Sequence, residues 1–204
     1  MDRTTELSII RRAFAKQVLA EVQVDDPGIE AAFATVPRED FLGPGPWVIP
    51  RWLAGLVPTP SADPVYVYVD NIVQIIAGRH LNNGQPSAHA KWIASAKIEP
   101  GDHVVHVGAG TGYYTAIMAH LVGDAGKVTA IELDHALAAR AKTNLSSLTN
   151  VRVIQGNGAT APFDAADVIY VNAGTNRPAD TWLDGLSERG RLCTADDGQG
   201  VHGQ

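Results

Sequence analysis

The chain of 204 residues contains a single cysteine, Cys193. A lone cysteine cannot form an internal disulfide, and it offers no pair of thiolates to a structural metal. This usage is typical of a reducing compartment, so we expect a cytoplasmic protein. No dense block of basic residues occurs, and 16 lysines and arginines against 22 acidic residues give a formal net charge of -6. A nucleic-acid partner is therefore not expected, because binding a phosphate backbone requires clustered positive charge.

Long hydrophobic runs are also missing. Nowhere do about 18 apolar residues follow one another, as a membrane-spanning helix requires. The N-terminus mixes charged and apolar residues and lacks the apolar core of a secretory signal. No internal repeat or low-complexity tract occurs. We expect a soluble protein without membrane association and with one sizeable core, since this length leaves little room for a second domain.

The first 80 residues combine helical periodicity with a proline-rich stretch. Apolar residues at helical spacing predict an amphipathic helix before residue 25, and a second short helix is predicted over residues 28–35. Six of the twelve prolines fall between Pro44 and Pro64, where they forbid a long helix. Residues 65–69 alternate valine and tyrosine, which predicts a short strand. We expect residues 1–80 to form an extension packed on the core.

Helices and apolar strands alternate over residues 81–194. Such alternation is typical of a parallel sheet covered by helices on both faces, so the predicted fold class is α/β with a doubly wound, mostly parallel sheet. The predicted strands cover residues 103–107, 128–131, 151–154, 168–171 and 191–194, and the predicted helices cover residues 85–98, 113–121, 135–145 and 178–186.

A glycine-rich turn, Gly108-Ala109-Gly110-Thr111-Gly112, follows the first of these strands. It does not fit the dinucleotide pattern G-x-G-x-x-G, because Tyr113 and Thr115 stand where the third glycine would be. It is no P-loop either, because no lysine follows. An NAD-dependent oxidoreductase is thus disfavoured. The turn lets a ligand approach the backbone at the carboxyl ends of the strands, where open α/β sheets bind ligands.

Polar side chains follow the next two strands. The Glu132 carboxylate can accept hydrogen bonds from two ribose hydroxyls, and the Asn157 amide, between Gly156 and Gly158, can meet an adenine edge. Each has a plainer alternative, Glu132 as a solvated strand end and Asn157 as a turn residue. Their order on successive strands favours an adenosine pocket without a pyrophosphate. S-adenosyl-L-methionine is the predicted cofactor, with its amine and carboxylate held by the glycine turn and the following helix start.

These motifs resemble those of the protein-L-isoaspartate (D-aspartate) O-methyltransferase family, a branch of the class I S-adenosylmethionine-dependent methyltransferases. The resemblance covers residues 36–192 and is carried by VPREDF, NNGQPSAHA, HVGAGTGYYTAIMA, VTAIELD, GNG and RGRL. It implies a Rossmann-like fold and methylation of a carboxylate on a protein or peptide, as in isoaspartyl repair. The implied catalytic residues are Gly84, Gln85 and His89. The implied cofactor-binding residues are Gly108, Ala109, Gly110, Thr111, Gly112, Glu132, Leu133, Asn157, Gly158 and Asn172.

Three residues depart from the family pattern. His106 stands where an acidic residue usually helps orient the glycine turn, Asn157 replaces an aspartate, and Gly84 replaces the active-site serine. An isoaspartyl α-carboxylate, with a pKa of about 3.5, is already ionised and needs no general base, so a lost hydroxyl is expected to weaken positioning or to mark a changed acceptor. Two alternatives stay open: a methyltransferase with another acceptor, and a noncatalytic S-adenosylmethionine-binding protein. His89 as a packing residue and Asn172 as a turn residue also stay open.

The last ten residues are polar and glycine-rich. Class I methyltransferases close with an antiparallel hairpin after the fifth strand, and residues 195–204 are too short to supply it. We therefore expect a flexible or truncated tail. The sheet edge left exposed predicts association of copies through that edge or low stability. No metal is expected, because His103, His106 and His120 show no metal-ligand spacing with carboxylates.

Overall fold

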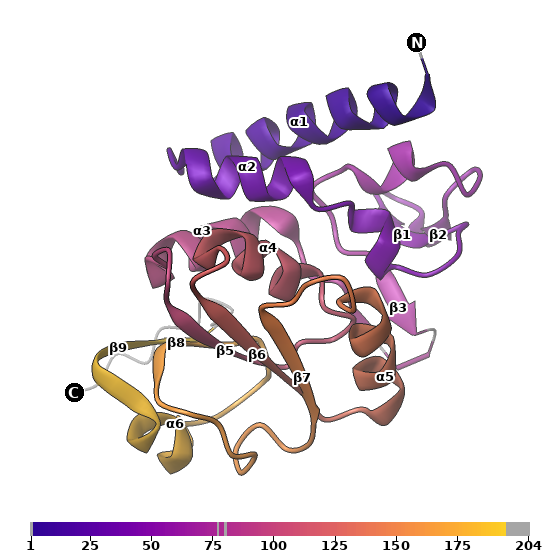
Figure 1. The fold of residues 1–204 in the computed structure, drawn as a ribbon. Helices are drawn as coiled ribbons and strands as arrows, with labels where there is room; N and C mark the ends of the chain where they lie inside the picture. Colours follow the sequence, from indigo (N-terminus) through magenta and orange to yellow (C-terminus); the bar gives the residue numbers. More distant parts are fainter. Residues whose placement is uncertain (1, 77, 80, 195–204) are drawn as a thin grey trace, which may run out of the picture.

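The computed structural model describes residues 2–76, 78–79 and 81–194 (Figure 1). Its centre is a five-stranded parallel sheet with the strand order β7-β6-β5-β8-β9. The order reverses between β5 and β8, and this reversal marks the place where such sheets bind ligands. The predicted α/β fold class with a parallel sheet is confirmed. The strands are β5 (His103–Val107), β6 (Lys127–Glu132), β7 (Val151–Gln155), β8 (Ala166–Val171) and β9 (Leu186–Thr194).

Alternate residues of these strands enter two separate apolar cores, one on each face of the sheet. Val104 and Val168 pack into the larger core with α3 and α4, whereas Val105 and Ile169 pack into a smaller core with Trp182 of α6. This division follows from the two-residue period of a strand, which sends neighbouring side chains to opposite faces. The helices are α3 (Pro86–Ala96), α4 (Tyr113–Val122), α5 (His135–Asn144) and α6 (Asp180–Asp184).

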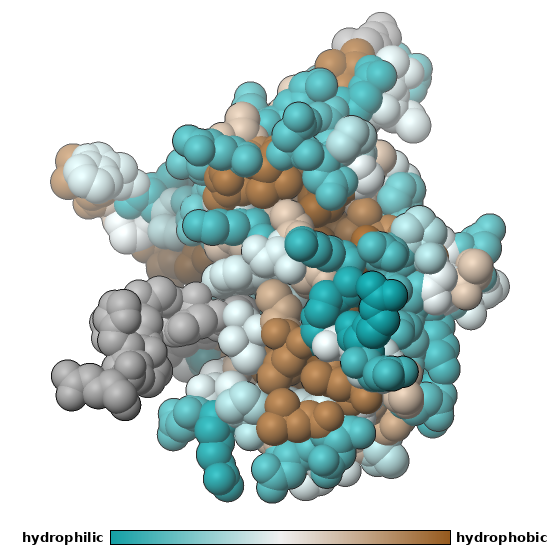
Figure 2. Space-filling model, turned by 90° about the vertical axis from the view of Figure 1, so that its left-hand side faces the viewer, coloured by the Kyte–Doolittle hydropathy of each residue, from teal (hydrophilic) through white to brown (hydrophobic). Residues whose placement is uncertain are grey.

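Two further helices, α1 (Arg3–Glu21) and α2 (Pro27–Thr35), lie across α3 and α4 (Figure 1). Asp2 and Asp26 cap them by accepting hydrogen bonds from backbone N–H groups of the first turn. Hydrophilic side chains line the outer side of α1, and apolar side chains lie beneath it (Figure 2). The helices that the periodicity predicted are thus present, while the division at residue 80 stays a prediction.

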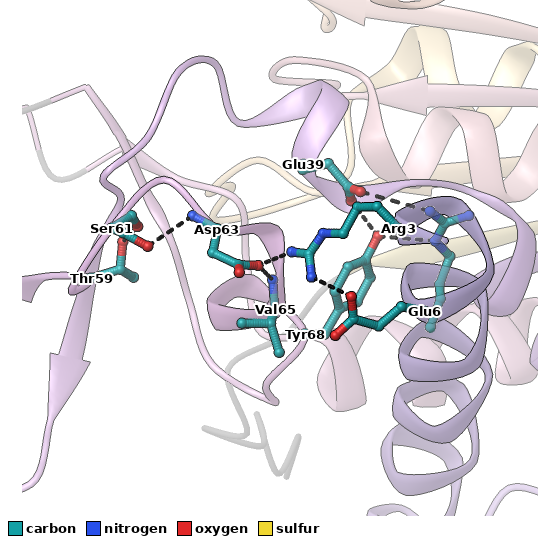
Figure 3. Close-up of polar contacts among 9 residues, drawn as sticks. Arg3, Glu6, Glu39, Thr59, Ser61, Asp63, Val65 and Tyr68 are labelled. Carbon is teal, nitrogen blue, oxygen red and sulfur yellow. Dashed lines mark hydrogen bonds and ion pairs between the residues drawn. The ribbon is translucent and has the colours of Figure 1, made fainter. Parts of the chain in front are cut away.

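The proline-rich stretch contains an antiparallel hairpin, β1 (Val48–Arg51) with β2 (Gly55–Pro58), between two 3-10 helices, η1 (Arg38–Phe41) and η2 (Pro64–Val67). The strand predicted over residues 65–69 is wrong. Pro64 begins η2 and the Asp63 carboxylate accepts a hydrogen bond from the Val65 N–H, so local capping overrides the β-branched pattern. Figure 3 shows how this segment is tied to α1: Arg3 pairs with Asp63 and Glu6.

A short antiparallel pair, β3 (Gln74–Ile76) with β4 (Leu81–Asn82), leads from the proline-rich stretch into α3. At the other end, β9 begins five residues before its predicted start, and α6 is shorter than the predicted helix over 178–186. The predicted tail, residues 195–204, lies outside the described residues. Within the described part, no helix has the length and apolarity needed to cross a membrane.

Candidate active site

A cavity of about 850 Å³ opens where β5, β6, β7 and β8 end. Parallel strands present their carboxyl ends at one edge of the sheet, so four loops that are far apart in the sequence meet there. Its volume lies within the range of small-molecule sites. The described lining includes these predicted residues: Gly108, Ala109, Gly110, Thr111, Glu132, Leu133, Asn157, Gly158 and Asn172.

The glycines of the turn after β5 differ in how much space surrounds their Cα atoms. Gly108 and Gly110 both have positive φ, +79° and +58°, which favours glycine. A Cβ atom at Gly108 would lie 2.7 Å from the Asn172 carbonyl oxygen, whereas a Cβ at Gly110 would meet nothing within 4 Å. Gly108 is therefore needed for packing, and Gly110 leaves open space beside the cavity. Gly112 packs against Leu145 and is not among the described residues that line the cavity.

Glu132 fixes the middle of this turn from the neighbouring strand. Its Oε2 accepts a hydrogen bond from the Gly110 N–H at 2.7 Å, and its Oε1 accepts one from the Asp134 N–H at 2.9 Å. Only 8% of Glu132 is exposed, yet it lines the cavity. A carboxylate offers about four acceptor positions, so about two remain for hydroxyl groups of a ligand. Position 106 holds a histidine, and the carboxylate that bonds to the glycine turn is that of Glu132.

The His106 side chain contacts α4 and β8. Its side chain is fully buried, and Nδ1 lies 2.8 Å from the Thr115 hydroxyl on α4. Its ring meets the Tyr170 ring edge to face. Burial lowers the pKa of His106 to about 3, so the imidazole is neutral at physiological pH. It therefore brings no charge to the cavity.

The loops after β7 and β8 form one wall of the cavity. The Asn157 side-chain oxygen accepts a hydrogen bond from the Ala159 N–H, which is the turn role, while the residue also lines the cavity. Asn172 donates its backbone N–H to the Val107 carbonyl and is half-buried. Leu133 lines the cavity at its rim and is 67% exposed.

Gly158 is confined by its neighbours in this wall. A Cβ atom there would lie 2.3 Å from Val107 Cγ1, and the Gly158 carbonyl accepts a hydrogen bond from Trp182 Nε1 at 2.7 Å. We expect Gly158→Ala to lower the free energy of unfolding by about 1 to 3 kcal/mol, because the methyl group overpacks the wall. Urea denaturation measures this. Gly174→Ala, where a Cβ meets nothing within 4 Å, is the control, and equal stability of the two variants would contradict the crowding.

The sequence analysis missed other lining residues, among them Arg79, Tyr113, Asp134 and Trp182. Thr111 and Tyr113 are each 1% exposed, and their hydroxyl oxygens have no hydrogen-bond partner within the described structure. A buried hydroxyl without a partner is costly, so these two groups are natural donors for a ligand. Of these two residues, only Thr111 was predicted. Arg79 and Asp134 form an ion pair at the rim, 2.6 Å long. Trp182 of α6 donates a hydrogen bond to the Gly158 carbonyl in the wall. The ion pair and the hydrogen bond each join residues that are far apart in the sequence, so no local pattern predicts them.

The three predicted catalytic residues lie next to the cavity, beyond its described lining. Gln85 donates its side-chain amide to Asp70, which also accepts the Ser87 backbone N–H and so caps α3. His89 is 2% exposed, with Nδ1 2.8 Å from the Tyr170 hydroxyl. Asn82 and Asn83, just before Gly84, do line the cavity. No group of three or more His, Cys, Asp or Glu side chains in the described ranges could hold a metal ion.

A family model described as protein-L-isoaspartate (D-aspartate) O-methyltransferase matches residues 57–197. The chain belongs to this family. A Thermotoga maritima protein-L-isoaspartate O-methyltransferase is 31% identical over 170 residues, which cover 80% of this chain and 49% of the relative. A Koribacter versatilis protein of the same name is 32% identical over 192 residues, which cover 92% of this chain and 77% of the relative. The chain thus spans about half the length of the first relative.

Solved structures agree with this assignment to the protein-L-isoaspartate O-methyltransferase family. One such enzyme superposes with a TM-score of 0.73 at 29% identity, covering 89% of this chain and 54% of its own. A Plasmodium falciparum structure of that description, in complex with S-adenosyl-L-homocysteine, gives a TM-score of 0.69 at 19% identity and covers 89% and 82% of the two chains. The second likeness shows the fold alone. The resemblance implied by the sequence motifs is confirmed.

Proposed function

We propose that this chain binds S-adenosyl-L-methionine in the cavity at the end of the sheet and methylates a carboxylate of a protein or peptide. The observation that carries the proposal is the Glu132 carboxylate, which is oriented by the Gly110 and Asp134 N–H groups at the edge of a cavity of about 850 Å³. Family membership supports it. The proposal includes a reducing, cytoplasmic location, which the single Cys193 supports, and association of copies along β9, an outer strand of the described sheet.

The residues of the cavity fit this cofactor. The acceptor positions left on Glu132 suit two ribose hydroxyls, and Leu133, Asn157 and Gly158 would flank the adenine. Gly108 to Thr111 and the N-terminus of α4 would hold the methionine end, where positive helix-dipole charge favours a carboxylate. The unpartnered Thr111 hydroxyl supports a polar ligand at this place. Asn172 would lie near the reacting group.

When bound, the cofactor supplies an electrophilic methyl group on a sulfonium. An ionised carboxylate oxygen of the acceptor forms a bond to that methyl as the carbon–sulfur bond breaks, which leaves a neutral ester and a thioether with no proton to transfer. The protein therefore needs no general base. Its contribution is to align the two partners and to exclude water.

A methyltransferase with a different acceptor is the second candidate. Gly84 stands where the family has an active-site serine, and its φ of +71° disfavours any other residue. Methylation of an isoaspartyl peptide with tritiated cofactor tests the first candidate, and a base-labile methyl ester is the expected product. Transfer to cell extract but not to the isoaspartyl peptide would favour the second. Calorimetry with S-adenosyl-L-homocysteine and with NADH tests the cofactor, and heat with NADH alone would overturn the proposal.

Glu132→Ala is expected to weaken binding of S-adenosyl-L-homocysteine by about 1 to 3 kcal/mol, because the ribose hydroxyls lose a charged acceptor and Gly110 loses its anchor. Isothermal titration calorimetry measures the change. Asp164→Ala removes the same charge from an exposed carboxylate that pairs with Lys127, outside the described lining, and is the matched control. Equal affinity of the two variants would remove Glu132 from the binding site.

A further inference from the structure

Three large apolar side chains are exposed at the tip of the β1–β2 hairpin. Trp52 is 90% exposed, Leu53 92% and Leu56 51%, and all three lie in the segment 51–56, which we call the hairpin tip. The other tryptophans of the chain are buried or half-buried. Exposing a tryptophan and two leucines to water is unfavourable, and apolar side chains exposed together are typical of an interaction site.

The base of this hairpin is anchored in the core. The Thr59 N–H donates to the Trp47 carbonyl at 2.7 Å, and the Trp47 N–H donates to the Thr59 hydroxyl at 3.0 Å. Both residues are buried, as is Ile49 of β1. The hairpin is therefore fixed at one end, and the hairpin tip presents its apolar side chains to solvent at the other.

Leu53 occupies a backbone conformation that leucine disfavours. Its φ is +63°, in the left-handed region that suits glycine. Because Leu53 is 92% exposed, packing of its side chain within the described structure does not offset this unfavourable conformation. A glycine or an asparagine would turn the chain here with less strain. The leucine thus adds apolar surface to the hairpin tip at a cost in stability, which is typical of a residue that acts in binding.

The hairpin tip lies outside the segment that matches the methyltransferase family. That match begins at residue 57, within β2, and Trp52, Leu53 and Leu56 all precede it. These side chains bring no acid, base or nucleophile to a methyl transfer. The hairpin tip therefore bears on which partner binds, and not on the transfer step.

Hydrogen bonds join the hairpin to the wall of the cavity. The Asn71 side chain donates to the Pro50 carbonyl of β1 at 3.0 Å, and the Asn71 carbonyl accepts from Arg38 at 2.8 Å. Arg38 also donates to the Asn83 side-chain oxygen at 3.0 Å, and Asn83 lines the cavity. In Figure 1 the hairpin and β3 lie on the same side of the central sheet, and Ile75 of β3 lines the same cavity.

Of three kinds of partner, a polypeptide acceptor fits the hairpin tip best. Each partner of a stable dimer buries about 800 Å² from about 20 to 30 residues, far more than three exposed side chains offer. An anionic lipid surface attracts clusters of lysine and arginine, whereas the hairpin tip has one arginine, Arg51, and the chain has a net charge of -6. Contact with an acceptor must be weak, because the product leaves after each transfer, and a small apolar surface supplies such a contact.

We propose that the hairpin tip binds an apolar segment of the acceptor polypeptide while the carboxylate to be methylated lies in the cavity. This inference rests on the proposed function and assigns the surface that selects long acceptors over short ones. An extended chain gains about 3.3 Å per residue, so a short peptide that fills the cavity does not also reach the hairpin tip. Trp52 and Leu53 are the anchors, because they are the most exposed of the three side chains.

A double variant removes the anchors and keeps the turn. Trp52→Ser with Leu53→Asn replaces both apolar side chains, and asparagine tolerates the left-handed backbone at position 53 better than leucine does. Ile9→Ser, which removes an exposed apolar side chain from α1, is the matched control. Rates of tritiated methyl transfer are measured on an unfolded polypeptide that carries one isoaspartyl residue and an apolar segment, and on the short peptide cut from around that isoaspartyl residue.

We expect the double variant to raise the KM for the polypeptide about five- to thirtyfold, because two apolar contacts are lost, and to keep kcat within about twofold, because neither contact involves the reacting atoms. The KM for the short peptide should stay within about twofold, and Ile9→Ser should change neither KM. An unchanged KM for the polypeptide, or an equal rise for both acceptors, would overturn the proposal. Urea denaturation checks that the double variant is folded.

Quenching of tryptophan fluorescence by acrylamide is the second readout, because Trp52 is the most exposed tryptophan. With S-adenosyl-L-homocysteine present, the polypeptide should shield Trp52 from acrylamide, and the short peptide should not. Shielding by vesicles of phosphatidylcholine and phosphatidylserine, or by a higher protein concentration, without shielding by the polypeptide would overturn the proposal in favour of a lipid surface or a second copy. If the wild type methylates neither acceptor, the proposed function fails, whereas shielding by the polypeptide still reports binding at the hairpin tip.

Discussion

Replacing Arg38 by alanine is expected to lower the free energy of unfolding by about 3 to 5 kcal/mol. The side chain is fully buried, and its guanidinium donates five hydrogen bonds. Without it, five buried or partly buried oxygen atoms lose this partner, at a cost of about 1 to 3 kcal/mol for each one left unsatisfied, which water entering the space partly offsets. The acceptors are Asn83 Oδ1 and the carbonyl oxygens of Val67, Val69, Asn71 and Gly84.

Urea denaturation followed by circular dichroism measures this loss. Arg51→Ala removes an exposed arginine from β1 and is the matched control, expected to change stability by less than about 0.5 kcal/mol. Arg38→Lys should recover part of the loss, because an ammonium group has three donors in place of five. If Arg38→Ala were no less stable than Arg51→Ala, the carbonyl groups would have to find other partners, and the segments around 67–71 and 82–84 would not depend on Arg38.

The strands of the central sheet could be predicted because each one is marked by a short apolar segment of the sequence itself. Residues 103–107 form a short apolar run between turn residues, and a strand buried on both faces is the arrangement that such a run favours. Residues 65–69 carry a similar composition and form no strand. The 3-10 helix forms there because the Asp63 carboxylate caps its first turn and Pro64 has a fixed φ. Both residues precede residues 65–69, so the composition of that segment alone did not reveal them. The start of β9 was missed because residues 186–190 lack an apolar run.

The cavity could be predicted in part for a topological reason. Gly110, Glu132 and Asn157 each follow a predicted strand, and the carboxyl ends of parallel strands must lie at one edge. How these residues bond could not be predicted. The Glu132 bond to the Gly110 N–H depends on the register of two strands, and the place of His89 depends on how α3 packs against Tyr114 and Tyr170. Such contacts join residues between 22 and 81 positions apart, so no local pattern reports them.

Acidification from pH 7 to 4.5 is expected to lower the free energy of unfolding by about 3 to 5 kcal/mol through His89 and His106. Both rings are buried and neutral, and burial lowers the pKa of His106 to about 3 and that of His89 below its usual range. The unfolded chain, with ordinary histidine pKa values of about 6.5, therefore binds protons first. This stability is fully present above about pH 6.5 and is lost as the pH falls toward the pKa values of the folded state.

Carboxylates lose their contribution in a different range of pH. Backbone and side-chain hydrogen bonds hold the pKa values of Asp134, Asp164 and Asp167 below 3.8, so their effect on stability starts at about pH 5 and becomes large only below about pH 4. Urea denaturation at intervals between pH 7 and 4.5 thus isolates the histidines. Burial also lowers the pKa of His103, which adds to the slope in this range. His106→Gln should remove a large part of the slope, and His120→Gln, the same change on the exposed side of α4, is the control. An unchanged slope in His106→Gln would mean that the folded chain protonates the buried His106 ring as readily as the unfolded chain does, and would contradict the prediction.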